Sequence, residues 1–148
     1  MIRVAVLGQK TFVRSRFAFA SDMLARVLDF ATLEELVDDI AMFSADILIV
    51  DESDDSFDAN VISLLLSRHC PQTKTLILSS SQPTFSALEN SGYSARALIA
   101  PEQHQLLTKA IRVVHAGEAW IPRRLVAEVL DRFVASVSAS ANFRPKLL

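Results

Sequence analysis

Short apolar runs alternate along this chain with longer stretches in which apolar residues recur every three or four positions. The short runs are typical of strands buried on both faces of a parallel sheet, and the longer stretches of amphipathic helices. Strands are predicted at residues 2–7, 26–30, 46–50, 73–79 and 96–99. Helices are predicted at residues 11–22, 33–43, 60–68, 84–90 and 102–115. This alternation predicts an α/β fold.

Local signals define the start of one helix and the faces of two others. Thr32 is predicted to cap the helix that follows it, and Glu35, three residues later, completes a capping box. The residues expected near the inner face of the first helix are Phe12, Phe17 and Leu24. Those expected on the inner side of the helix at 102–115 are Leu106, Leu107, Ala110, Ile111 and Val114.

Five strands that alternate with helices predict a doubly wound parallel sheet. Short connections and right-handed crossovers favour the flavodoxin-like (CheY-like) strand order 2-1-3-4-5. That order places the ends of the first and third strands side by side. Gly8 and Asp51, which follow or end those strands, are therefore expected to share one crevice.

A sixth helix is predicted from Pro122, at its first turn, to about Val137. An apolar stripe runs along it through Val126, Leu130, Phe133 and Val137. Such a stripe needs a cover, which is either the domain itself or a partner. The serine- and alanine-rich segment 136–142 that follows is predicted to be a flexible linker, and the remaining residues a tail.

Composition limits the classes of function that the chain can serve. Its 148 residues suffice for one domain, and a net charge of −2 provides no general attraction for nucleic acid. Cys70 is the one cysteine, so no internal disulfide forms, and no two of the three histidines stand at metal-ligand spacing. With no signal peptide and no apolar run near the roughly 18 residues that span a membrane, a cytoplasmic location is expected.

Asp51 is the residue whose position most clearly indicates a chemical role. It ends the apolar run 47–50, so it delivers a carboxylate to the crevice at the carboxyl ends of the strands. The neighbouring first strand ends in Gly8-Gln9, which carries no charge.

Several motifs together resemble one family. They are the opening Ile2-Arg3-Val4 with Val13-Arg14, Asp51 after its strand, Asp58-Ala59, Ser79 at the end of the fourth strand, and the stretch 110–123. On these the chain resembles, over residues 2–135, the receiver domain of LuxR/NarL-type response regulators. The resemblance implies a receiver-like domain at 1–118, a linker helix at 119–137 and a tail at 138–148. The tail would lead to a helix-turn-helix DNA-binding domain that is not in this chain. The resemblance also implies that Asp51 is the phospho-acceptor position and Ser79 the switch position.

The pattern departs from the family where phosphoryl chemistry needs charge. Receivers carry two metal-binding acids after the first strand, where this chain has Gly8 and Gln9. They carry a lysine after the fifth strand, where this chain has Ala100 and then Pro101. Phosphorylation adds about −1.5 to −2 charges, which here would meet Glu52, Asp54 and Asp55 without compensation. We therefore expect no cofactor and slow, labile or absent phosphorylation.

These observations predict an atypical, phosphorylation-independent receiver that acts as a regulatory and dimerisation module for DNA-binding output, with a homodimer as the expected assembly. The alternative is a working phospho-acceptor, served by a histidine kinase, in which Glu52, Asp54 or Asp55 replaces the missing Mg²⁺ ligands. In the structural interpretation, Asp51 and residues 79–81 form only local hydrogen bonds.

Trp120 and Arg123 support a further alternative. The segment Trp120-Ile121-Pro122-Arg123 resembles the Trp-[Phe/Leu/Met]-[Thr/Ser]-Arg junction of cyclic di-GMP-responsive regulators, in which an aromatic ring and an arginine take the nucleotide. Here Ile121 and Pro122 occupy the middle positions. The structural interpretation is that the tryptophan packs the linker helix.

No enzymatic activity is expected. A phosphatase of the haloacid dehalogenase type needs a second aspartate two residues after its nucleophile, and that position is Ser53. A glycine-rich phosphate loop is also missing, because Gly8 stands alone in the first turn.

Overall fold

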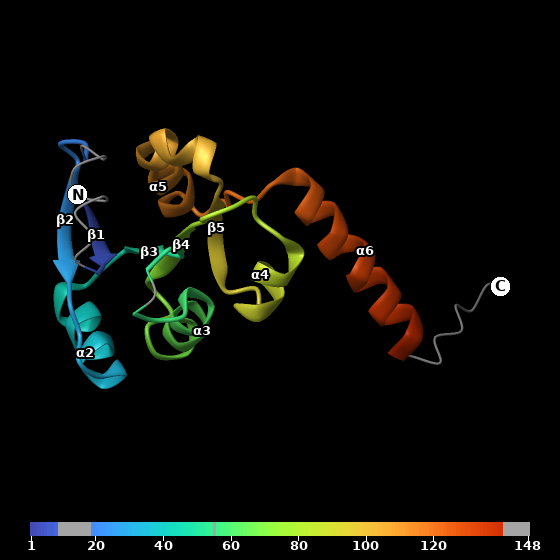
Figure 1. The fold of residues 1–148 in the computed structure, drawn as a ribbon, viewed down its shortest axis with the longest axis horizontal. Coiled ribbons are helices and arrows are strands. Elements are labelled where there is room, and N and C mark those ends of the chain that lie inside the picture. Colours follow the sequence, from blue (N-terminus) through green and yellow to red (C-terminus); the bar gives the residue numbers. More distant parts are fainter. Residues whose placement is uncertain (9–18, 55, 141–148) are drawn as a thin grey trace.

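The computed structural model describes residues 1–8, 19–54 and 56–140 and forms one five-stranded sheet. Its strands are β1 (Ile2–Leu7), β2 (Met23–Leu28), β3 (Ile47–Asp51), β4 (Lys74–Leu78) and β5 (Ala95–Ile99). All pairings are parallel, in the order β2-β1-β3-β4-β5 (Figure 1). The predicted fold and strand order are confirmed.

Helices cover both faces of the sheet. The helical elements are α2 (Leu33–Phe43), α3 (Ala59–His69), α4 (Phe85–Asn90), the 3₁₀ helix η1 (Pro101–Leu106), α5 (Leu107–His115) and α6 (Arg123–Ser140). Buried side chains of α2, α3 and α4 share one apolar cluster, and those of α5 share another on the opposite face. Within β3, Leu48 belongs to the first cluster and Ile49 to the second, because successive strand residues point to opposite faces. This explains the continuous apolar runs in the sequence.

The capping box at α2 is present. Thr32 Oγ1 accepts a hydrogen bond from the Glu35 backbone N–H at 3.2 Å, and Glu35 Oε2 accepts one from the Ala31 N–H at 2.9 Å. The carboxylate therefore reaches the residue before the cap, and the start of α2 lies where it was predicted.

Two predictions at the start of the chain need correction. Of the helix predicted at 11–22, residues 11–18 lie outside the described residues, while residues 19–22 are not helical. Strand β2 begins at Met23, earlier than predicted, because it pairs with β1 along its whole length from Ile2 onward. Leu24 is consequently an exposed strand residue. An ion pair at 2.9 Å between Asp22 and Arg112 of α5 holds the preceding turn.

The helix predicted at 102–115 is two elements. A 3₁₀ helix begins at Pro101, and its first turn is closed by a hydrogen bond of 2.8 Å from the Gln103 N–H to the Ala100 carbonyl. The α-helix begins only at Leu107, so Leu106 is exposed rather than on the inner side.

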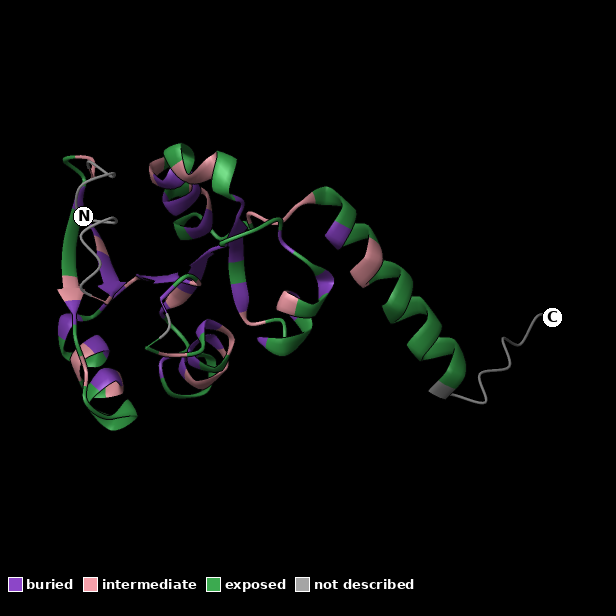
Figure 2. Cartoon of the chain, in the orientation of Figure 1, coloured by how far each residue is buried: buried purple, intermediate pink, exposed green. Residues whose placement is uncertain are grey.

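Helix α6 differs from its prediction at both ends. It begins at Arg123, with Pro122 just before it, and the Pro122 carbonyl accepts bonds from the N–H groups of Leu125 and Val126. It continues to Ser140, so the predicted linker is helical through that residue, because its alanines and serines include no helix breaker. Figures 1 and 2 show α6 extending away from the body with most of its surface exposed. No helix in the described part of the chain meets the length and apolarity that crossing a bilayer requires.

Candidate functional site

Asp51 ends β3 at the carboxyl edge of the sheet, between β1 and β4, and we call this edge and the loops that follow it the crevice. The side chain of Asp51 is buried, with the residue 4% exposed, and its Oδ1 accepts bonds from the Ser53 N–H at 2.9 Å and the Ser53 hydroxyl at 2.7 Å. Its other oxygen, Oδ2, is buried and has no hydrogen-bond partner among the described residues. The loop after β3 thus folds back on the carboxylate that the sequence singled out.

The next acid in this loop, Glu52, reaches across to the loop after β4. Its Oε1 accepts a bond from the Ser80 N–H at 3.2 Å and another from the Ser80 hydroxyl at 2.8 Å. The Glu52 carboxylate therefore already accepts the hydrogen bonds that the Ser80 N–H and hydroxyl could otherwise donate to an incoming anion.

Asp54 is the third acid, and its position explains why residue 8 is a glycine. Asp54 is buried, and its Oδ1 accepts a bond of 3.0 Å from the Ser56 N–H. Its Oδ2 lies 2.6 Å from the position that a Cβ on Gly8 would occupy, and Gly8 itself has φ +98°. A side chain at position 8 would therefore meet both backbone strain and a buried carboxylate.

On the β4–β5 side, the residues at the positions of the receiver hydroxyl and lysine are uncharged. Ser79 is buried, and its N–H donates to the Ile99 carbonyl at 2.9 Å, which joins the end of β4 to β5. Ala100 is buried where receivers carry a lysine, and Pro101 begins η1. Gln9 lies outside the described residues.

The phospho-acceptor alternative requires a Mg²⁺ ion beside Asp51. Mg²⁺ needs near-octahedral oxygen ligands, usually including one or two free carboxylates. Asp51, Glu52 and Asp54 each commit an oxygen to loop donors, and Asp55 lies outside the described residues. Within 1–8, 19–54 and 56–140, no group of three His, Cys, Asp or Glu side chains is placed to hold a metal. The described residues thus include no preformed group of three metal ligands, although Asp51 Oδ2 is left without a hydrogen-bond partner among them.

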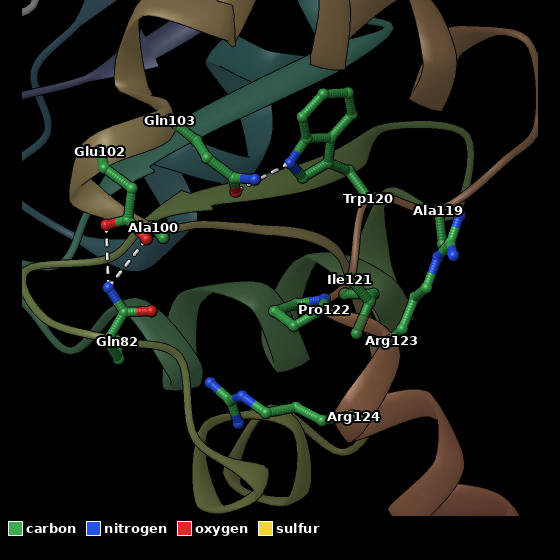
Figure 3. Close-up of a pocket in the computed structure, with 10 residues that line it drawn as sticks. All are labelled: Gln82, Ala100, Glu102, Gln103, Ala119, Trp120, Ile121, Pro122, Arg123 and Arg124. Atoms are coloured by element: carbon green, nitrogen blue, oxygen red, sulfur yellow. Dashed lines mark hydrogen bonds between the residues drawn. The ribbon is translucent and has the colours of Figure 1, made fainter.

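A second site is a cavity of about 620 Å³ at the base of α6. Its lining comes from the loop after β4, from η1, from the segment between α5 and α6 and from the start of α6 (Figure 3). It consists of Gln82, Ala100, Glu102, Gln103, Ala119, Trp120, Ile121, Pro122, Arg123 and Arg124. Trp120 and Arg123, the candidate ligand residues, both line it. It also brings in Glu102 and Gln82, which no motif indicated.

Trp120 is held by the sheet. Its backbone forms a parallel bridge beside β5, with bonds of 2.9 Å to the Arg96 carbonyl and 3.0 Å from the Leu98 N–H. Its indole packs partly buried against the α5-side cluster and donates from Nε1 to Gln103 Oε1 at 3.3 Å. Figure 3 shows the side chains of Arg123 and Arg124 pointing away from each other.

The loop after β4 is fastened to three other elements. Besides the Ser80–Glu52 bonds, the Gln82 amide donates to both carboxylate oxygens of Glu102, at 2.9 and 2.8 Å. Arg124 of α6 donates to the Pro83 carbonyl at 2.6 Å. These bonds join the Asp51 crevice to η1 and α6 through one loop. Sequence reasoning missed them because the partners are far apart along the chain.

Gln82→Leu is expected to raise the pKa of Glu102 toward its ordinary value. The hydrogen bond from Gln82 is the main reason that this pKa lies below its ordinary value. Since the folded-state pKa is lowered, the contribution to stability exists above the ordinary pKa and is lost as pH falls through the lowered value. Carboxyl ¹³C NMR titration measures the shift. The control is Gln105→Leu on η1, and an unchanged Glu102 titration in Gln82→Leu would contradict the assignment.

Helix α6 presents two different faces. Leu125, 1% exposed, and the half-buried Val129 pack against the α2–α4 side, and the Arg132 guanidinium lies 4.0 Å from the centre of the Phe85 ring. The stripe predicted from the sequence faces solvent instead, with Leu130 60% and Phe133 66% exposed. Val126 and Val137 are exposed beside them, as is Val134. The body of the domain does not cover this stripe.

Comparisons with known proteins bear on the fold. No family model and no curated protein sequence matches the chain. The isolated receiver domain of RcsB from Salmonella enterica serovar Typhimurium, solved with the phosphomimetic BeF₃⁻, is 17% identical with a TM-score of 0.63, over 84% of this chain and 97% of that one. A structure of Salmonella typhimurium RcsB concerned with DNA interaction is 18% identical with a TM-score of 0.68, over 97% and 85%. A LuxR-family response regulator from Aurantimonas sp. is 17% identical with a TM-score of 0.64, over 89% and 97%. The chain therefore has the receiver fold.

Proposed function

We propose that this receiver-fold domain is a phosphorylation-independent regulatory and dimerisation module that controls an attached DNA-binding domain. The similarity to RcsB and to a LuxR-family regulator supports a place in transcriptional regulation, since one RcsB structure concerns DNA interaction. The proposal assigns no catalytic reaction to the domain.

The carrying observation is that the acids around Asp51 are held by loop donors, while position 100 provides an alanine and no cation. Glu52 takes the N–H and hydroxyl of Ser80, while Ser53 holds one oxygen of Asp51. On the β4–β5 side, Ala100 offers a methyl group where charge compensation would require an amine. A phosphoryl group on Asp51 would have to displace the Glu52 carboxylate or lie beside it. Like charges repel more strongly as solvent is excluded.

Incubation with beryllofluoride or acetyl phosphate and Mg²⁺ is therefore expected to leave the protein unmodified. Mass spectrometry reads the acetyl phosphate reaction, and ¹⁵N NMR reads beryllofluoride binding. The RcsB receiver, which has been solved with BeF₃⁻, serves as the positive control. Asp51→Asn is the matched negative control, and its response should equal that of the wild type. A stoichiometric adduct that disappears in Asp51→Asn would establish the phospho-acceptor alternative instead.

The dimerisation part of the proposal rests on α6. Exposed apolar surface in a continuous stripe marks interaction sites on soluble proteins. Arg124 of α6 donates a hydrogen bond to the Pro83 carbonyl in the loop after β4. Pairing through α6 would therefore be sensitive to the conformation of that loop.

The cavity beside Trp120 is where the cyclic di-GMP alternative would apply. Calorimetry with cyclic di-GMP on the wild type and on Arg123→Ala separates it from the principal proposal. Binding that depends on Arg123 would support the alternative, whereas the sheet bridge and Gln103 bond of Trp120 already explain that residue by packing.

A further inference from the structure

The exposed stripe of α6 has the spacing of a coiled-coil seam. Its members Val126, Leu130, Phe133 and Val137 are separated by four, three and four residues, which is the alternation of a heptad. We call these residues the outer seam. Val134, also exposed, lies beside it and widens the apolar face. A seam of this period is complementary to a second copy of itself.

Arg123 continues the outer seam by three residues at the N-terminal end of α6. It is exposed, and within the described part of the chain it forms no hydrogen bond or ion pair. In a parallel pair, the two Arg123 side chains would meet where both helix dipoles are positive. In an antiparallel pair, each would lie beside residues near Ser140 of the partner's helix, toward the negative end of the helix dipole.

We propose that a second copy of this chain docks on the outer seam with its α6 antiparallel. This inference rests on the proposed dimerisation and adds its direction and register. The midpoint of the seam falls between Asp131 and Arg132. Around that midpoint, Leu130 faces the partner subunit's Phe133, and Val126 faces the partner subunit's Val137. A leucine thus packs against a phenylalanine in both central layers.

The size of the seam indicates a reversible pair. The exposed parts of its four side chains and of Val134 amount to roughly 500 Å² per copy, so a pair that covered them completely would bury roughly 1,000 Å² of this surface, at the lower bound of specific interfaces. The free half of α6 is also covered in this arrangement. Residues 131–139 are all exposed, and the antiparallel pairing lays them along the body-proximal half of the partner's helix.

Disulfide cross-linking distinguishes the two directions. In a Cys70→Ala background, Leu130→Cys and Phe133→Cys proteins are mixed and exposed to a mild oxidant. The antiparallel register predicts at least about tenfold more cross-linking in the mixture than in either protein alone, because only unlike positions come within disulfide reach. Val126→Cys with Val137→Cys repeats the test at a second layer. Like-with-like cross-links would overturn the direction while retaining a dimer.

Arg123→Ala also distinguishes the two directions, because its expected effect on the dissociation constant has opposite signs in an antiparallel and a parallel pair. Removal of the cation should weaken an antiparallel pair roughly threefold to thirtyfold, whereas it would tighten a parallel one by relieving repulsion. Sedimentation equilibrium measures the change. A tightened pair overturns the inference, and a wild-type protein that is monomeric at every concentration overturns both the inference and the proposed dimerisation.

Discussion

Leu130→Asp is expected to make the protein monomeric while leaving the fold of the monomer intact. Leu130 is 60% exposed and lies on the outer seam, so the folded monomer loses no core packing. In the pair, each substitution would bury a carboxylate against apolar side chains without a partner. We expect the dissociation constant to rise at least about 100-fold. Sedimentation velocity over a range of concentrations measures it.

The matched control is Met42→Asp on α2. Met42 is an 84% exposed apolar residue on a different surface, so the same change of character there should leave association intact. Phe133→Asp should reproduce the effect of Leu130→Asp. An association constant that is equal in the wild type and in both seam variants would show that α6 carries no interface.

Gly8→Asp is expected to destabilise the protein by about 4 kcal/mol, although it restores an acid that receivers carry. A positive φ of this size costs an L-residue about 1–2 kcal/mol. The contact of 2.6 Å requires the buried Asp54 side chain, whose Oδ1 is held by the Ser56 N–H, to move, which costs about 1–3 kcal/mol. The new carboxylate would also lie near the buried Asp54. Urea denaturation followed by circular dichroism measures the loss.

Gly117 provides the control for this prediction. Its φ of +100° nearly equals that of Gly8, but a Cβ there meets nothing within 4 Å. The Gly8→Ala loss should therefore exceed the Gly117→Ala loss by the cost of the Asp54 contact alone. In an Asp54→Ala background the two losses should converge. Equal losses for Gly8→Ala and Gly117→Ala in the wild type would show that Asp54 yields without cost.

Much of the fold was predictable because its signals are local. The third strand, 47–50, is a continuous apolar run, and the Thr32–Glu35 box defined a helix start within one turn. Predictions failed where neighbours in space set the boundary. Pairing with β1 begins β2 at Met23, and a 3₁₀ turn after Pro101 delays α5.

The candidate site divides in the same way. Sequence reasoning identified Asp51, the uncharged Gly8 and Ala100, and the α6 stripe, since each depends only on residue type and spacing. It could not show that Glu52 accepts the hydrogen bonds of Ser80, because the two residues are 28 positions apart in the sequence.

By itself, the sequence determined the order of the strands, the position of Asp51 at a strand end, and the period of the apolar stripe. These follow from side-chain periodicity and chain connectivity, which act over a few residues. Tertiary structure alone decided that Asp54 lies over Gly8, that one loop joins the crevice to α6, and that the stripe faces solvent. Such outcomes depend on which distant groups the packed sheet brings within hydrogen-bonding distance, and no local pattern encodes that distance.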